Sequence, residues 1–141
     1  MRKATRVLVG LKTLEHAAEL TEVACRLSAS NASLRLVHVI ELPDVTPLDA
    51  DVPDLEILAG KVLRTAERVV RRYGLKHTSS VFRAHSAGEA LLTEMTEKKT
   101  DLAVFGHHHK RTFGEILLGT SAQYLSNHAP CHVIFVVPPR T

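Results

Sequence analysis

Residues 106–121, GHHHKRTFGEILLGTS, combine the residue types with which a protein holds an anion. The segment begins with Gly106 directly after Leu102–Phe105, an apolar run typical of a short buried strand. It ends with small hydroxylated residues, which are good N-caps for the helix that the following residues predict. A glycine after a strand, a loop and a Gly-Thr-Ser helix start together place backbone N–H groups around an anion. We therefore predict an anion site, with His109 where such a loop favours a second glycine.

The three consecutive histidines His107–His109 raise the question of a metal site. Adjacent side chains alternate direction in an extended loop, so at most two of them share an ion without further ligands. No cysteine or carboxylate lies next to them in the sequence, although His85 or Asp101 could approach in space. Histidines in such loops more often hydrogen-bond to backbone or face solvent, so we predict no metal site. Their clustering allows a pH-dependent surface, because imidazole titrates near neutrality.

Motifs for catalysis are missing. The chain has no Gly-x-Ser-x-Gly segment. Ser121 is more simply a helix N-cap, and Cys131 a buried small apolar residue at the start of a strand. His38 lies in a strand that is apolar on both sides, which predicts a core histidine with its hydrogen bonds satisfied. Glu41 and Asp44 could line a pocket but form no evident acid–base pair. We predict a protein that is not an enzyme, in which slow ATP hydrolysis would require ATP to bind first.

Length and composition predict one soluble globular domain over residues 1–141, with 45% hydrophobic and 23% charged residues. Aromatic residues make up 4% and Trp is absent, which disfavours base stacking on an aromatic platform. Cys25 and Cys131 have neither disulfide nor metal-ligand spacing, which favours a reducing compartment. No stretch has the length of a membrane span, and no apolar signal region follows Met1-Arg2-Lys3. We predict a cytoplasmic protein without a membrane partner.

The net charge of +3 and the pI of about 9.1 raise the question of a nucleic-acid partner. Four arginines share one side of a predicted helix: Arg64, Arg68, Arg71 and Arg72. Glu67 interrupts them, the other basic residues are scattered, and no nucleic-acid motif is present. Such a stripe is more often a solvated helix face, so we predict no nucleic-acid partner.

The chain alternates strands and helices. Apolar or alternating runs predict five strands, at residues 5–11, 34–41, 77–84, 101–106 and 131–137. Helical spacing predicts helices at residues 14–30, 86–99 and 120–128, and a long helix that follows residue 53 and ends at a C-cap at Gly74. The apolar side of this long helix consists of Leu55, Leu58, Val62, Ala66, Val69 and Tyr73. Residues 42–53, rich in Pro and Asp, predict an exposed connection.

Five strands alternating with four helices imply right-handed crossovers and a parallel sheet with helices on both faces. We predict a doubly wound α/β fold with strand order 3-2-1-4-5, which reverses between the first and fourth strands. Ligands in such folds lie outside the carboxyl ends of the strands at the reversal. The two loops there are residues 10–13 and 106–109, so both glycine-bearing loops fall where the topology predicts a site.

Four stretches carry a family resemblance: VLVG, LRLVHVIE, DLAVFGHHHK and GEILLGTSAQYLSNHAPCHVIFVVP. The last is the most specific, down to Ala129-Pro130 before the final strand. On these stretches the chain resembles the universal stress protein family over essentially its whole length. The resemblance implies a doubly wound five-stranded fold of the adenine nucleotide alpha hydrolase type and a dimer paired through the last strand. It also implies a stress-linked role that is regulatory rather than catalytic.

ATP-binding members of that family carry the motif Gly-x2-Gly-x9-Gly-Ser/Thr. Here Gly106 matches the first glycine, His109 occupies the second, and Gly119-Thr120 match the end. Those members also hold the ribose hydroxyls with an Asp after the first strand, where this chain has Lys12. The resemblance implies an ATP site, with a backbone contact to adenine in the second strand. Its residues are Lys12, Val39, Gly106, His109, Gly119, Thr120 and Ser121.

Two of these positions, His109 and Lys12, differ from the motif, and the chemistry of each side chain indicates what the difference does to a nucleotide site. Histidine visits the left-handed backbone region more often than most residues, so the turn survives at His109 while its ring crowds the phosphate path. The ammonium of Lys12 has donors and no acceptor, so it cannot replace a carboxylate. It either faces solvent or joins Lys110 and Arg111 in attracting an anion. Two hypotheses follow: a nucleotide-binding regulatory module, or a nucleotide-independent dimeric interaction protein whose pocket His109 closes.

The last strand, CHVIFVV, is apolar along its length and would be an aggregation hazard as an exposed edge. Pairing with the same strand of a second copy removes this hazard, and two-fold contacts are the commonest solution. Alternatively, residues 42–53 cover the edge. We predict the homodimer.

Overall fold

The computed structural model describes residues 2–106, 110–112, 115–117, 120–137 and 139. A parallel five-stranded sheet forms its centre, in the order β3-β2-β1-β4-β7. The strands are β1 (Ala4–Leu11), β2 (Ser28–Glu41), β3 (Lys76–Ala84), β4 (Leu102–Gly106) and β7 (His132–Val136). The helices are α1 (Leu14–Arg26), α2 (Pro53–Arg72), α3 (Ala87–Glu97) and α4 (Thr120–His128). The predicted doubly wound α/β fold and its strand order are confirmed.

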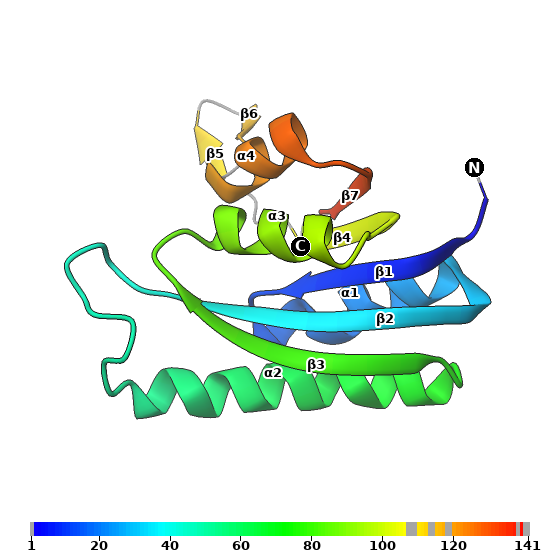
Figure 1. The fold of residues 1–141 in the computed structure, drawn as a ribbon, viewed down its shortest axis with the longest axis horizontal. Coiled ribbons are helices and arrows are strands. Elements are labelled where there is room, and N and C mark those ends of the chain that lie inside the picture. The colour runs from blue at the N-terminus through cyan, green and yellow to red at the C-terminus, as the bar shows by residue number, and fades with distance from the viewer. Residues whose placement is uncertain (1, 107–109, 113–114, 118–119, 138, 140–141) are drawn as a thin grey trace.

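Helices cover both faces of the sheet, α1 and α2 on one and α3 and α4 on the other (Figure 1). Side chains of β1 alternate between the two layers, as the pleat requires. Val7 and Val9 enter the core beneath α1 and α2, whereas Leu8 enters the core beneath α3. This burial on both faces accounts for the continuous apolar run of the first strand.

The helix predicted at residues 14–30 ends earlier than expected, at Arg26, and β2 already begins at Ser28. Residues 28–33 read SASNAS, and Ser and Asn compete with the helix by bonding to nearby backbone. The hydroxyl of Ser28 donates to the carbonyl of Ala24 at 2.7 Å. In addition, the backbone N–H of Ala4 donates to Leu27 at 3.1 Å, which draws the chain into the sheet.

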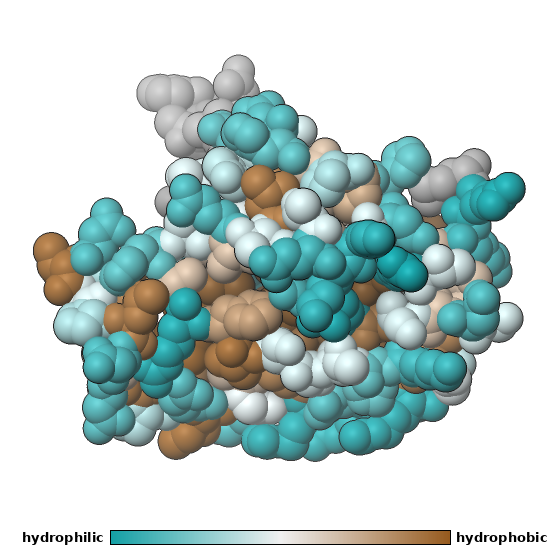
Figure 2. Space-filling view, in the orientation of Figure 1, coloured by the Kyte–Doolittle hydropathy of each residue, from teal (hydrophilic) through white to brown (hydrophobic). Residues whose placement is uncertain are grey.

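The buried side of α2 differs from the predicted one. Its buried residues are Ala59, Val62, Leu63, Ala66, Val69 and Val70. Leu55 and Leu58 are exposed, because burial of the helix begins only at Ala59. Tyr73, the C-cap at the other end, is also exposed, and its hydroxyl contacts Arg26 and Glu22 at the surface. Figure 2 shows apolar side chains at this end of the molecule, over the β2–α2 connection and the first turns of α2.

The predicted end of α2 is confirmed. Gly74 has a φ of +68°, the left-handed conformation that glycine adopts without strain. Its N–H donates to the backbone carbonyl of Arg71 at 3.0 Å, and the N–H of Leu75 donates to the backbone carbonyl of Val70 at 3.3 Å. These two bonds are a Schellman motif, which satisfies carbonyls that the end of the helix leaves without partners.

A second, two-stranded antiparallel sheet lies within the segment predicted as a loop. It pairs β5 (Lys110–Thr112) with β6 (Glu115–Leu117). Strands of three residues are too short to show a period of two in the sequence, so the pattern did not predict them.

Strand β7 lies at one edge of the five-stranded sheet and pairs with β4. The connection at residues 42–52 leaves β2 beside β3, at the opposite edge (Figure 1). The alternative in which this connection covers the last strand is therefore wrong.

The two cysteines are unpaired, as their spacing predicted. Cys25 is buried, and this burial, with a smaller contribution from the charge of Glu22, raises the pKa of its thiol to about 11. Cys131 is half-buried rather than fully buried, and burial also raises the pKa of its thiol. Within the described ranges, no helix combines the length and the apolar character that crossing a membrane needs.

Candidate functional site

The carboxyl ends of β1, β2 and β4 lie side by side along one border of the sheet. This border is called the carboxyl edge below, and the border formed by the amino ends of the strands is called the amino edge; neither is one of the outermost strands. Leu11 at the end of β1 pairs with His38 of β2, and Gly10 pairs with Phe105 of β4. Because the strand order reverses between β1 and β4, this edge is the switch point at which doubly wound folds bind ligands. Lys12 and Gly106 lie one residue beyond these paired positions.

The structure thus brings three of the predicted site residues to the same edge: Lys12, Val39 and Gly106. Lys12 is exposed, and within the described residues its ammonium has no ion-pair partner. Val39 is half-buried on the face that α3 covers. Gly106 is exposed, and a Cβ added to it would meet Cδ2 of Leu20 at 3.6 Å, an ordinary contact. Among the described residues other than its chain neighbours, this ordinary contact is the only one within 4 Å of the added carbon, so they do not block a close approach to Gly106.

Two further predicted residues begin α4, and two lie outside the described residues. The helix starts at Thr120, so Ser121 lies inside its first turn and not at the predicted N-cap. His109 and Gly119 lie outside the described residues. The first-turn N–H groups of Thr120 and Ser121 have no carbonyl partner within the helix, which suits them to an anion.

Gly10, which belongs both to the predicted first strand and to the predicted loop at residues 10–13, lies within β1. A Cβ at Gly10 would lie 2.4 Å from Cδ1 and 2.5 Å from Cε1 of Phe105. The ring of Phe105 is buried and packs against Phe135 with 5.9 Å between centroids. Gly10 therefore makes room for an aromatic side chain in the core, beneath the site.

His38 is a core histidine, as predicted. Its side chain is 5% exposed, and its Nδ1–H donates to the carbonyl of Leu11 at 2.8 Å. Burial lowers the pKa of the imidazole, against smaller opposing effects of the Leu11 carbonyl and the charge of Glu56. A neutral ring therefore joins the ends of β1 and β2 directly below Lys12.

Acid is expected to weaken the fold through His38. Because the folded pKa is lowered, the unfolded chain binds this proton more readily, so stability is fully present above about pH 6.5 and is lost as the pH falls toward the folded pKa. Urea unfolding at pH 7.5, 6.5 and 5.5 measures the free energy of unfolding. Below about pH 6.5 this free energy should fall less steeply in His38→Gln than in the unmodified protein, by about 1 kcal/mol per pH unit. Exposed His128→Gln is the matched control. An equal pH dependence in all three proteins would contradict the prediction.

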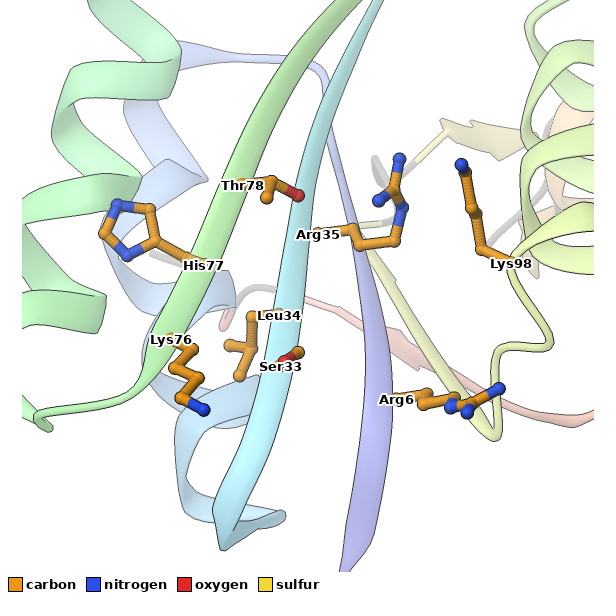
Figure 3. Close-up of a pocket in the computed structure, with 8 residues that line it drawn as sticks. All are labelled: Arg6, Ser33, Leu34, Arg35, Lys76, His77, Thr78 and Lys98. Atoms are coloured by element: carbon orange, nitrogen blue, oxygen red, sulfur yellow. The ribbon is translucent and has the colours of Figure 1, made fainter.

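A cavity of about 410 Å³ lies at the other, amino edge of the sheet (Figure 3). None of the predicted site residues lines it. Asp101, considered above as a ligand of a histidine site, also lies at this edge, where its carboxylate accepts from the N–H groups of Thr5 and Arg6 at 3.0 and 3.1 Å. It therefore sits at the far end of β4 from Gly106. Residues 107–109 lie outside the described residues, and the rest forms no cluster of three or more His, Cys, Asp or Glu suited to a metal.

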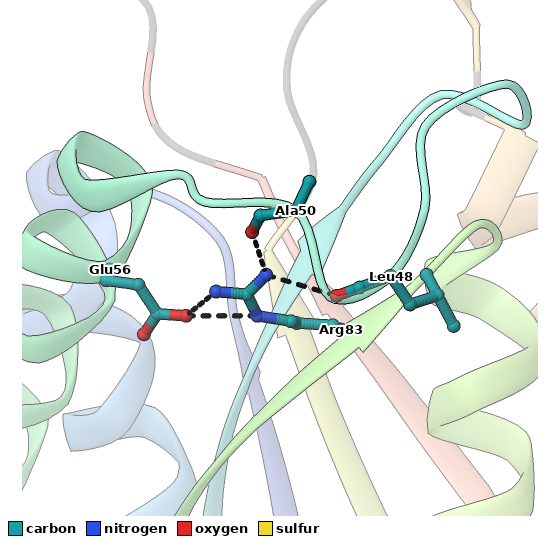
Figure 4. Close-up of polar contacts among 4 residues, drawn as sticks. All are labelled: Leu48, Ala50, Glu56 and Arg83. Carbon is teal, nitrogen blue, oxygen red and sulfur yellow. Dashed lines mark hydrogen bonds and ion pairs between the residues drawn. The ribbon is translucent and has the colours of Figure 1, made fainter.

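Arg83 of β3 holds the β2–α2 connection at the carboxyl edge (Figure 4). One guanidinium nitrogen, Nη1, donates to the carbonyls of Leu48 at 3.1 Å and Ala50 at 2.5 Å. The Nε and Nη2 atoms donate to one oxygen of Glu56, at 3.1 and 2.6 Å. Sequence reasoning missed this residue. The available signal was a single arginine in an alternating strand, which has no distinctive pattern.

Glu41, considered above as a pocket-lining residue, has a structural role. Its Oε2 accepts from the N–H of Ala87, the first residue of α3, at 2.7 Å. Ser86, the first residue of the predicted helix 86–99, is the N-cap of α3, since its hydroxyl oxygen accepts from Glu89 N–H at 3.2 Å. The start of α3 is thereby attached to the end of β2.

Comparisons with known proteins agree with this geometry. Residues 3–137 match the profile of the Universal stress protein family. The universal stress protein from Archaeoglobus fulgidus has a TM-score of 0.73 at 18% identity, covering 93% of this chain and 97% of its own. The Archaeoglobus protein in complex with dAMP has a TM-score of 0.67 at 19% identity, covering 96% and 98%. A universal stress protein family protein from Arabidopsis thaliana with AMP bound has a TM-score of 0.62 at 17% identity, covering 96% of this chain and 92% of its own. No curated protein matches the chain in sequence.

Proposed function

The chain belongs to the universal stress protein family, and from this premise we propose that it is a regulatory module whose ligand is an adenine nucleotide. The observation that carries the proposal is the convergence of Lys12, Val39 and Gly106 at the switch point of the sheet. The dAMP and AMP held by two structural relatives support an adenine nucleotide as the ligand. The role is binding rather than catalysis.

In the proposed complex, the backbone of Val39 contacts adenine, and the phosphates lie between Gly106 and the first turn of α4. The ordinary spacing around Gly106 among the described residues, and the first-turn N–H groups of Thr120 and Ser121, favour phosphate there. Residues His109 and Gly119 complete the loop. Lys12 lies on the ribose side, where its ammonium cannot accept from the ribose hydroxyls. ATP is the ligand that the loop motif favours.

Added ATP is expected to raise the melting temperature, because a ligand that binds the folded chain stabilises it. Gly106→Ala should keep the fold and weaken ATP binding about tenfold, since its methyl group meets Leu20 at an ordinary distance but occupies the phosphate side. The double variant His109→Gly/Lys12→Asp restores the motif and should strengthen binding about tenfold. Thermal shift and mass spectrometry of ligand released on denaturation measure these effects.

Exposed Arg68→Ala serves as a control for the single substitution. Unchanged affinity in both site variants would mean that the site is misplaced. A melting temperature that ATP moves in none of the proteins would favour the second hypothesis, a nucleotide-independent interaction protein.

We also propose a homodimer paired through β7. This strand is the sheet edge beyond β4, and Val133–Val136 are only half-buried in the single chain. Sedimentation should give twice the mass of 15.5 kDa, and dilution should speed hydrogen exchange at the outward amides of β7. A monomer at all concentrations would contradict the dimer.

A location in the cytoplasm is part of the proposal. It is supported by the unpaired thiols of Cys25 and Cys131, which suit a reducing compartment.

A further inference from the structure

The cavity at the amino edge is lined mainly by basic and hydroxyl side chains from four elements. They are Arg6 of β1, Ser33 and Arg35 of β2, Lys76 and Thr78 of β3, and Lys98 after α3. Figure 3 shows Arg6, Arg35 and Thr78 extending toward the side of the sheet on which Lys98 lies, whereas His77 points to the other side. This placement follows from the pleat, since alternate residues of each strand share a face.

Most of the positive charge in this cavity is not neutralised. Among the described residues, the side chains of Arg6, Lys76 and Lys98 have no ion-pair partner. Glu94 of α3 pairs with Arg35, so it offsets one of the four charges. The nearby carboxylate of Asp101 is occupied by Thr5 and by the backbone of Arg6. The cavity therefore combines a net positive charge with unused donors.

Arg35 is only partly paired. Its Nη2 contacts Glu94, while its Nε is buried without a hydrogen-bond partner in the described part of the chain. A guanidinium has five N–H donors and binds oxyanions best through two of them at once. An anion that draws the guanidinium toward the cavity gives this N–H an acceptor.

We propose that this cavity is a second ligand site, for a small molecule that carries two or more linked phosphate groups. Four cations from separate elements suit a ligand whose negative charge is spread over several oxygens. Ser33 and Thr78 donate hydroxyl hydrogen bonds to the same oxygens. The site lies at the edge of the sheet opposite the proposed nucleotide site and does not depend on it.

The size of the cavity favours a small molecule over a nucleic acid. Its volume of about 410 Å³ falls within the range of small-molecule sites, about 300–1,000 Å³. The basic groups gather around this hollow instead of forming a stripe along the surface, and none of the eight lining residues is a Phe, Tyr or Trp on which a base could stack.

Linear tripolyphosphate is the probe, titrated by calorimetry at constant ionic strength. The double variant Arg6→Gln/Lys98→Gln should weaken its binding at least about tenfold, because it removes two unpaired cations. Both side chains are exposed, so the variant should fold as the unmodified protein does. Arg68→Gln/Arg72→Gln removes the same charge from the exposed side of α2 and should leave the affinity within about twofold.

Several results would overturn the proposal. Equal weakening in both double variants would mean general attraction to a basic protein. Loss of binding in Lys12→Asp but not in Arg6→Gln/Lys98→Gln would place the anion at the carboxyl edge. Inorganic phosphate that binds as tightly as tripolyphosphate would exclude recognition of linked phosphates. An oligonucleotide that binds through Arg6 and Lys98, with no response to tripolyphosphate, would assign the surface to nucleic acid.

Discussion

Replacing Gly10 with alanine is expected to lower the free energy of unfolding by about 3 kcal/mol. The added methyl carbon would lie 2.4 Å from the ring of Phe105, closer than such carbons approach any neighbour. The ring cannot swing into solvent, because it is 5% exposed and packs against Phe135. Because interiors are close-packed, the strand or the ring has to shift, and either movement disturbs the core beneath α3. Urea unfolding measures the loss.

A double variant separates this clash from an intrinsic effect of alanine in a strand. In Gly10→Ala/Phe105→Leu the smaller side chain leaves room for the methyl group. We expect this variant to be at least about 1 kcal/mol more stable than the sum of the two single substitutions predicts. Gly106→Ala, whose methyl group would meet Leu20 at an ordinary 3.6 Å, is the matched control and should cost less than about 1 kcal/mol. Equal losses at Gly10 and Gly106 would contradict the packing argument.

Arg83→Leu is expected to lower the free energy of unfolding by about 2 kcal/mol and to release the β2–α2 connection. The substitution leaves the carbonyls of Leu48 and Ala50 and the carboxylate of Glu56 without their donor. Arg83 and Glu56 are partly exposed, so water replaces some of these bonds and limits the loss. Hydrogen exchange should become faster in residues 42–52 while the protection of β1 and β4 stays unchanged.

The control for Arg83 is another arginine with an acidic partner. Arg26 pairs with Glu22 within α1, and its side chain is 70% exposed. Arg26→Leu should leave the free energy of unfolding nearly unchanged, because an exposed ion pair between residues one helical turn apart contributes little. A loss at Arg83 as small as that at Arg26, with unchanged exchange in the connection, would mean that the guanidinium does not hold it.

The sequence predicts those parts of this protein that repeat a simple period. The apolar runs of β1 and β4 identify two inner strands, and the alternation of elements leads to the strand order and hence to the edge where Lys12, Val39 and Gly106 meet. The start of β2 was missed because polar residues 28–33 join the sheet through backbone bonds, which leave no apolar pattern.

The features that the sequence did not predict depend on contacts between residues far apart in the chain, which leave no periodic pattern in the sequence. Arg83 donates to backbone carbonyls of a connection about 35 residues away in the chain. Every residue type has a backbone carbonyl, so the sequence does not show which residues accept from Arg83. The amino-edge cavity joins Arg6, Arg35 and Lys98 only after three strands and a helix have packed. Leu55 and Leu58 fit the period of α2, yet burial of the helix begins only at Ala59.

The two protonated thiols bear on oxidation. Peroxides and disulfides react with a thiolate, and a thiol with a pKa of about 11, such as that of Cys25, is ionised in on the order of one molecule in ten thousand at pH 7. The pKa of Cys131 is also raised by burial, and the chain has no other cysteine. Neither residue therefore suits an oxidant sensor.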